Sequence, residues 1–130
     1  MKELGINDVR VGNWVDVRYD GVSETPHIEK LTPASFLRNE HWFGIELTTE
    51  VLEKIGFKKD VNERGAYIIT VDNLLAGDGF ETQIVKIFCR DGCMSLNIET
   101  AVSRLFLPIK FVHELQNSLQ VCNINLEISL

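Results

Sequence analysis

The sequence predicts an α+β fold, in which a twisted antiparallel sheet, partly barrel-like, has two or three short helices packed on it. Three observations predict this class. Short segments rich in β-branched and aromatic residues alternate with turn signals along much of the chain. Two segments carry helix-capping residues, and a third has an apolar stripe at helical spacing. The 130 residues contain no repeat, low-complexity segment or linker, so we expect a single domain over residues 1–130.

The N-terminal part of the chain predicts a β-hairpin. Residues 14–19 alternate as in a strand with one buried face. One side carries Val15, Val17 and Tyr19, and the other carries Trp14, Asp16 and Arg18. Asp20-Gly21 favours a tight turn, and the return strand covers residues 22–31, with Pro26 at an edge or bulge. Trp14 lies opposite the valines, so it is either covered by a helix or exposed for binding.

A short helix and a loop are predicted next. Thr32 is a typical N-cap and Pro33 a typical first helical residue, so we expect a helix over residues 33–38. Residues 39–44 are predicted as a loop that carries two large aromatic side chains, and residues 45–47 as a short extended piece.

The second helix has stronger signals at both ends. Thr48 is the predicted N-cap, and carboxylates occupy the early turns, where the helix dipole favours them. Gly56 supplies a left-handed C-cap, after which Phe57 packs back on Leu52 as in a Schellman motif.

The second half of the chain is predicted to be mostly strand. Gly77-Asp78-Gly79 indicates a loop, and Arg90-Asp91-Gly92 indicates the turn of a hairpin. The expected strands are residues 66–71, 82–89, 93–98, 102–107 and 125–130.

Between the last two strands, residues 108–122 predict a helix with two different faces. An apolar stripe recurs at helical spacing, formed by Phe111, Leu115, Leu119 and Cys122 with Val112 beside them. The other side carries His113, Gln116, Asn117 and Gln120. Amides and an imidazole form hydrogen bonds in fixed directions without a net charge, which favours an ordered contact over a merely solvated surface.

Composition limits the classes of partner. The net charge is −6, from 19 acidic and 13 basic residues, and an acidic protein repels phosphate backbones, so nucleic-acid binding is not expected. There is no apolar run long enough to span a membrane, and the N-terminus lacks the apolar region of a signal peptide. We therefore expect a cytoplasmic protein with no membrane contact, and a C2 homodimer is the default expectation for its oligomeric state.

The sequence contains no recognisable catalytic or metal-binding set. Cys89, Cys93 and Cys122 are an odd number of thiols without a second ligand pair at zinc spacing, so we expect free thiols, no metal and no cofactor. A GxSxG motif, a P-loop and a dinucleotide-binding loop are all absent. A small hydrolase-type enzyme would need His113 or His27 at hydrogen-bond distance from a carboxylate. We do not expect an enzyme.

Three short blocks resemble a family of small proteins found in Bacteroidetes genomes and their phages or prophages. Residues 10–15 (RVGNWV) resemble the opening block of that family, and residues 111–117 (FVHELQN) resemble a block near its C-terminus. Residues 47–57 (LTTEVLEKIGF) are similar to a block that lies between them. The chain departs from the family pattern after residue 117. The resemblance implies a mobile-element or phage setting and implies no activity.

These observations lead to one main hypothesis and one alternative for binding. The main hypothesis is a non-catalytic binding protein that engages a host protein, as an antagonist of a host defence system would. Its expected contact surface is His41, Trp42, Phe43, Gln116, Asn117 and Gln120; the opposing interpretation is that Trp42 and Phe43 fold into the core. The alternative is a module that sequesters a nucleotide-like signal, with phosphates bound by Lys58, Lys59, Arg64 and Arg90.

Overall fold

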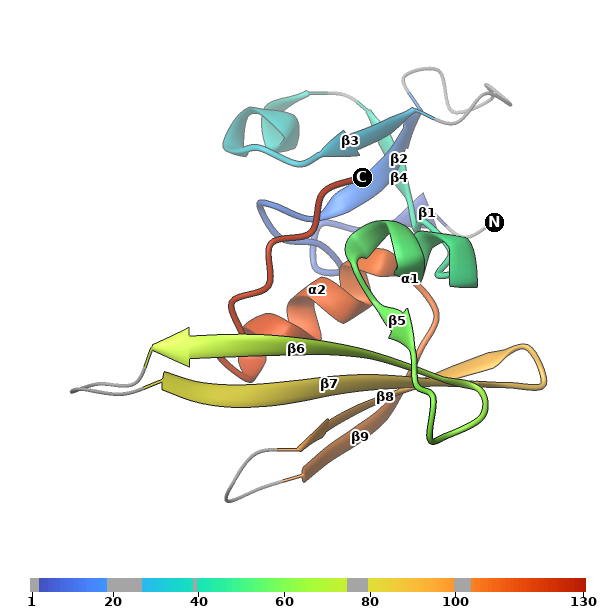
Figure 1. Cartoon of the computed structure of the whole chain (residues 1–130). Helices are drawn as coiled ribbons and strands as arrows, with labels where there is room; N and C mark the ends of the chain where they lie inside the picture. The colour runs from blue at the N-terminus through green and yellow to red at the C-terminus, as the bar shows by residue number, and fades with distance from the viewer. Residues whose placement is uncertain (1–2, 19–26, 39, 75–79, 100–103) are drawn as a thin grey trace.

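The computed structural model describes residues 3–18, 27–38, 40–74, 80–99 and 104–130, with only the backbone described at 72–74 and 80–82. Its described strands form two antiparallel sheets, shown in Figure 1. The four-stranded sheet has the order β1-β4-β2-β3 and the five-stranded sheet the order β5-β6-β7-β8-β9. The strands of the first are β1 (Glu3–Leu4), β2 (Trp14–Arg18), β3 (Ile28–Lys30) and β4 (His41–Phe43). Those of the second are β5 (Lys58–Lys59), β6 (Ala66–Leu74), β7 (Phe80–Arg90), β8 (Cys93–Glu99) and β9 (Arg104–Ile109).

The predicted α+β class is confirmed. The helices are the 3₁₀-helix η1 (Pro33–Leu37) and the α-helices α1 (Thr49–Ile55) and α2 (Val112–Val121). The sheet arrangement differs in one respect from the expectation, because the described strands form two separate sheets, neither of which closes into a barrel. No helix within the described residues is both long and apolar enough to cross a membrane.

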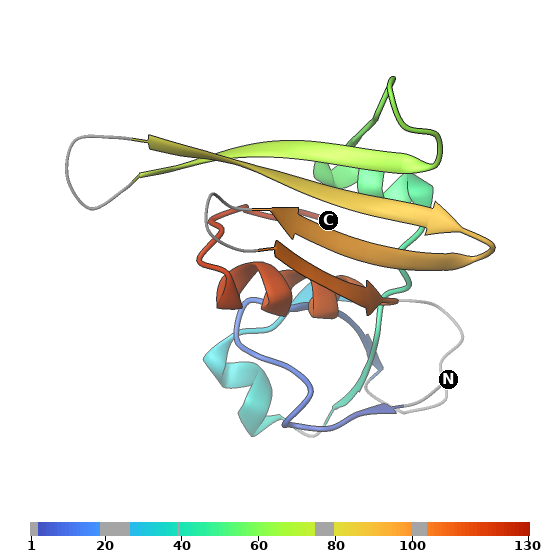
Figure 2. The same cartoon turned by 90° about the horizontal axis from the view of Figure 1, so that it is seen from below.

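The larger core lies between the five-stranded sheet and the two α-helices (Figures 1 and 2). Val85, Ile87 and Leu96 from the sheet are completely buried, together with Leu52 of α1 and Leu115 of α2. A hydrophobic core of this kind is the main source of stability in a small domain. The helices cover one face of the sheet only, as Figure 2 shows from the other side.

A smaller core belongs to the four-stranded sheet. It contains Val9, Val15, Val17, Leu31 and Trp42. The predicted hairpin partner is confirmed where the structure describes it, because β3 pairs with β2 through Trp14↔Lys30 and Asp16↔Ile28. The expected turn at Asp20-Gly21 and the bulge at Pro26 lie outside the described residues.

The prediction of a loop over residues 39–44 is wrong. Residues 41–43 form β4, which lies between β1 and β2, with Trp42 paired to Val17 and to Leu4. The three-residue segment has no alternation long enough to identify a strand, and its pairing partners are distant in the sequence. The predicted extended piece at 45–47 is present, and Glu46 forms an isolated bridge to Phe111.

The local signals of α1 are confirmed. The Thr48 hydroxyl accepts from the Val51 amide at 3.2 Å. At the other end, Gly56 has φ +123°, and the Phe57 amide donates to the Leu52 carbonyl at 3.0 Å, which is the Schellman hydrogen bond. The hairpin turn between β7 and β8 is also as predicted, because Asp91 and Gly92 both have positive φ, 52° and 76°.

The last part of the chain corrects two boundaries. Pro108 lies in β9 rather than at a helix start, a position that is tolerated because β9 is an edge strand. Helix α2 therefore begins at Val112, and the Glu114 carboxylate accepts from the Lys110 and Phe111 amides at its N-terminus, both at 2.9 Å. The strand predicted at 125–130 is absent: this tail buries Ile128 but pairs with no described strand.

Candidate functional site

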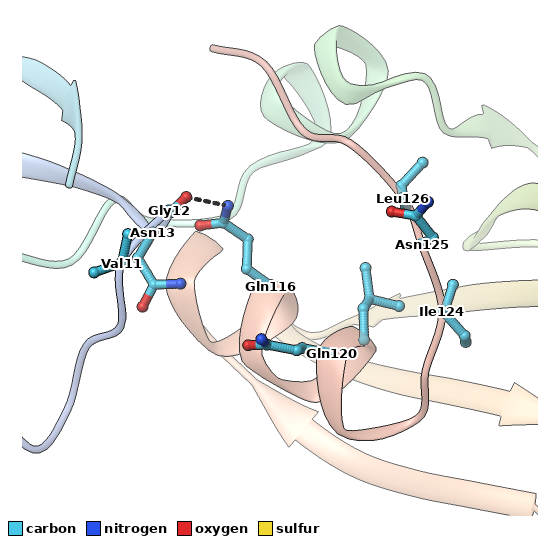
Figure 3. A pocket seen from close by; sticks show the side chains of 9 residues that line it. Val11, Gly12, Asn13, Gln116, Gln120, Ile124, Asn125 and Leu126 are labelled. Atoms are coloured by element: carbon cyan, nitrogen blue, oxygen red, sulfur yellow. Dashed lines mark hydrogen bonds between the residues drawn. The ribbon is translucent and has the colours of Figure 1, made fainter. Parts of the chain in front are cut away.

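The polar side of α2 contacts the N-terminal segment that leads into β2. The Gln116 side chain makes two hydrogen bonds to backbone groups there: its Oε1 accepts from the Trp14 amide at 2.8 Å, and its Nε2 donates to the Gly12 carbonyl at 3.0 Å. Figure 3 shows Gln116 extended from the helix toward Gly12. The Gln116 amide thus bonds one backbone N–H and one backbone carbonyl of the N-terminal segment, as the backbone of a neighbouring strand would do.

Two further side-chain bonds extend this contact along the helix. Asn13, which is almost fully buried, donates from Nδ2 to Asn117 Oδ1 at 2.9 Å. Arg10 donates to Gln120 Oε1 at 3.2 Å. The groove between these segments and the C-terminal tail is a hollow of about 210 Å³. The amides that line it hold the N-terminal segment against α2, and this role is internal to the fold.

His113 is buried at the beginning of α2 and does not point into that groove. Its ring is stacked on Phe111 at 5.7 Å between centroids, and Nδ1 has no hydrogen-bond partner among the described residues. Burial lowers the pKa of the imidazole, against a smaller opposing effect of Glu114 and Asp8. The Glu114 carboxylate accepts instead from the Lys110 and Phe111 amides, so this His and its neighbour do not form an acid–base pair.

The aromatic segment 41–43 makes its described side-chain contacts with its own sheet and the residues beside it. Trp42 is buried, its indole N–H donates to Glu40 Oε1 at 2.9 Å, and its ring meets Phe36 edge-on at 5.2 Å. His41 Nδ1 is 2.6 Å from the Glu3 carboxylate, and Phe43 is half-buried beneath the guanidinium of Arg18. For Trp42 the interpretation as a core residue is confirmed.

The sequence-based contact surface is therefore not a single patch. Its two parts lie on different elements, β4 and α2, and their described hydrogen bonds are all internal. Partner contact through these residues stays a prediction. Trp14 is half-buried and packs against the larger core, where its indole N–H donates to the Ile128 carbonyl at 2.8 Å. The C-terminal tail and not a helix thus provides that hydrogen bond.

The four predicted phosphate-binding cations are exposed and spread over one end of the five-stranded sheet. Lys58 and Lys59 line a hollow beside Gly56 and Ile69, whereas Arg90 lines a different one with Phe88. Arg64 lines neither of these hollows and adjoins Gly65, whose carbonyl accepts from the Cys89 amide at 2.8 Å. The structure does not gather the four into one phosphate site.

The two thiols of the β7–β8 hairpin are on opposite faces of the sheet. Cys89 pairs with Met94 and packs against the larger core, and burial raises the pKa of its thiol. Cys93 pairs with Arg90 and is exposed on the other face. Because the side chains point apart, Cys89 and Cys93 cannot hold one metal ion. Within the described residues, no group of three or more His, Cys, Asp or Glu side chains has metal-binding geometry.

One face of the five-stranded sheet is covered by no described helix or strand (Figure 2). We call it the open face. Strand register places on it the rows Lys58–Ile68–Lys86–Asn97–Phe106, Thr70–Ile84–Glu99–Arg104, Ala66–Phe88–Ser95–Pro108 and Arg90–Cys93. The Phe106 and Ile84 side chains are 63% and 49% exposed, although both lie in regular strands.

Charged and aromatic groups alternate along β7 on the open face. Phe88 lies between Lys86 and Arg90, and both cationic groups are 5.7 Å from its ring centroid. Lys86 Nζ is 2.8 Å from Glu63 and 3.6 Å from Asp60, and the hydrogen bond to Glu63 raises the pKa of Lys86. Sequence reasoning missed this face. Its signal is present, because residues 84–90 place large apolar groups on both sides of one strand.

No protein-family model, curated protein or solved structure gives a significant match to this chain.

Proposed function

We propose that this protein is a non-catalytic binding module that engages a protein partner through the open face of its five-stranded sheet. The observation that carries the proposal is the exposure of Phe106 and Ile84 on a face that no described element covers. Burying the exposed part of Phe106 in an interface is worth about 1–2 kcal/mol. Aromatic residues presented on a rigid scaffold are typical of interface anchors.

The chemistry of the described side chains supports binding rather than catalysis. His41 pairs with the Glu3 carboxylate but lines none of the hollows described above, and His113 is buried with no hydrogen-bond partner at Nδ1 among the described residues. The exposed Cys93 has no histidine beside it in the hollow that it lines with Phe88 and Arg90. A general base or an activated nucleophile needs such a partner. The resemblance of three sequence blocks to proteins of Bacteroidetes and their phages makes the proposed partner a protein of the bacterial host, as for an antagonist of host defence.

Photo-crosslinking tests the proposal. The photoreactive amino acid p-benzoylphenylalanine would replace Phe106 in one protein and Leu37 in a matched control, because Leu37 is even more exposed, at 90%, but lies on η1, outside the open face. Both proteins would be irradiated in Bacteroidetes lysate, and a partner captured only through position 106 would be identified and purified. We expect Phe106→Ala to weaken its binding by about tenfold or more, with Leu37→Ala unchanged.

Two results would contradict the proposal. One is equal capture of the same proteins from positions 106 and 37. The other is a purified partner whose dissociation constant is unaffected by Phe106→Ala while the variant keeps the circular dichroism spectrum of the wild type. Because Phe106 is mostly exposed, we expect the substitution to leave the fold intact.

A nucleotide-like ligand is the second candidate. Arg90, Phe88 and Phe106 line one hollow, where a base could stack on an aromatic ring and a phosphate could meet the guanidinium. This candidate is weaker, since only Arg90 of the four predicted phosphate-binding cations lines that hollow. Thermal unfolding with a panel of nucleotides tests it: a ligand at 100 times its dissociation constant adds about 2.7 kcal/mol of stability.

A further inference from the structure

The cations of the open face differ in whether their charge is neutralised. Lys86 is paired with Glu63 and Asp60, and Arg104 is paired with Glu99 at 2.9 Å. Arg90 has no carboxylate within ion-pair distance among the residues that the structure describes, and its one described contact is with the Phe88 ring. A guanidinium in contact with an aromatic face keeps its N–H groups available for a carboxylate.

A second unpaired cation lies at the same end of the sheet. Arg64 is exposed and, within the described part of the chain, pairs with no acidic side chain. It directly precedes Gly65, whose carbonyl accepts from the Cys89 amide at 2.8 Å, so the backbones that carry Arg64 and Arg90 lie side by side. Among the described residues, Arg90 is therefore a cation without a carboxylate partner beside Phe88, and the backbone of Arg64 lies next to that of Arg90.

Next to this charge is a hollow of about 260 Å³. Phe88 and Phe106 form its apolar walls, Arg90 and Ser95 supply polar groups, and the Glu63 carboxylate at its rim is already bonded to Lys86. A hollow of this volume accepts one apolar or aromatic side chain and is too small for most drug-sized ligands.

We propose that the open face recognises an acidic, extended segment of the partner. An apolar or aromatic side chain of that segment enters the hollow between Phe88 and Phe106, and a carboxylate two residues away pairs with Arg90. This inference rests on the proposed function. The two-residue spacing follows from geometry, because Phe88 and Arg90 are two residues apart on one strand, and an extended partner repeats its side chains at the same interval of ~6.6 Å.

The overall charge of −6 does not prevent this contact. At physiological ionic strength the screening length is about 8 Å, so an incoming carboxylate is affected mainly by the charges closest to it. Beside the hollow those are Arg90 and the group of Lys86 with its two carboxylates, Glu63 and Asp60. Of the cations there, Arg90 is the one without a carboxylate partner among the described residues.

A random peptide display library selected against the whole protein tests the inference. Wild type is expected to enrich peptides with Asp or Glu two residues from Phe, Tyr, Trp or Leu. Arg90→Glu should replace that acidic preference with Lys or Arg, and it should weaken the best wild-type peptide by about tenfold. Lys54→Glu makes the same charge change on the exposed side of α1 and should leave both the selection and the affinity unchanged.

The other outcomes separate this inference from the proposed function. Peptides that depend on Phe106 but show no acidic preference would overturn the acidic segment and leave protein binding through the open face in place. A library that enriches nothing on wild type would overturn the inference. If, in addition, adenosine monophosphate or a 12-nucleotide oligo(dT) bound to wild type and not to Phe106→Ala, the proposed protein partner would be overturned as well.

Discussion

Replacing Gln116 with alanine should loosen the attachment of the N-terminal segment to α2. The substitution removes both hydrogen bonds of the side chain and leaves the Trp14 amide and the Gly12 carbonyl without these partners. A hydrogen bond of this kind contributes about 0.5–1.5 kcal/mol net, and an unsatisfied, partly buried backbone group costs about the same or more. We therefore expect a loss of about 1–3 kcal/mol in the free energy of unfolding.

The corresponding change in melting temperature follows from the size of the chain. With 130 residues and about 2.1 cal/mol/K per residue, the entropy of unfolding is about 270 cal/mol/K, so 2 kcal/mol corresponds to ~7 °C. Urea unfolding followed by far-UV circular dichroism measures the free energy. Amide hydrogen exchange at Trp14 reports the local contact, and its protection should fall in the variant.

Two control variants separate hydrogen bonding from other effects. Gln116→Met keeps most of the side-chain volume and removes both hydrogen bonds, so it should lose nearly as much stability as Gln116→Ala. Gln120→Ala removes one 3.2 Å bond from an exposed side chain and should change the free energy by less than about 0.5 kcal/mol. If both Gln116 variants lose less than about 0.5 kcal/mol and Trp14 exchange is unchanged, the docking role is refuted.

Three further predictions concern buried or crowded groups. Burial lowers the pKa of His113 in the folded state, so the stability that the neutral ring contributes is complete above the unfolded pKa of about 6.5 and is lost as the pH falls below that value. His113→Leu should therefore reduce the difference between the unfolding free energies measured at pH 7.5 and at pH 5.5. An unchanged difference would contradict this prediction. A Cβ at Gly44 would lie 2.7 Å from the Phe111 ring, so Gly44→Ala should lower the free energy of unfolding, measured in urea, by about 1–3 kcal/mol. Gly5→Ala is the control, because its Cβ would have its nearest contact at 3.5 Å and should change the free energy little. Equal effects of the two substitutions would refute the crowding at Gly44. Asn97 Oδ1 is buried with no hydrogen-bond partner among the described residues. Asn97→Val should therefore increase the free energy of unfolding by about 0.5–1.5 kcal/mol and raise the urea midpoint. A lower midpoint would show that the amide is hydrogen-bonded in solution.

The sequence was sufficient where the deciding interactions are local. Thr48 and Gly56 cap a helix through bonds to residues within one turn, so α1 was predicted nearly to its ends. Asp91-Gly92 defines a hairpin because both residues adopt positive φ. The strands β6 to β9 were found by composition, with boundaries short by a few residues at some ends. Each of these signals needs only neighbours in the chain.

The sequence was insufficient where an element depends on pairing with a segment that is distant in the chain. Strand β4 exists because Trp42 pairs with Val17 and Leu4, and no periodicity within three residues reveals that. The tail after residue 122 has a strand-like alternation, yet the alternation reflects burial of Ile124 and Ile128 rather than pairing. Alternation measures which side chains are buried, and backbone pairing needs a second segment at the right place.

The candidate site shows the same division. The amphipathic pattern of α2 determined that one side is core and that the amides on the other side make directed hydrogen bonds, and both properties are present in the structure. His113, which the pattern assigned to the polar side, is instead buried, with no hydrogen-bond partner at Nδ1 among the described residues. Only the tertiary structure decided that Gln116 and Asn117 bind residues 12–14, more than 100 positions away. Likewise, composition determined a net charge of −6, but the arrangement of strands decided that Arg90, which pairs with no carboxylate among the described residues, lies beside Phe88 and Phe106 on the open face. Charge and hydrophobicity are additive along a sequence, whereas a binding surface depends on which distant residues the fold brings together.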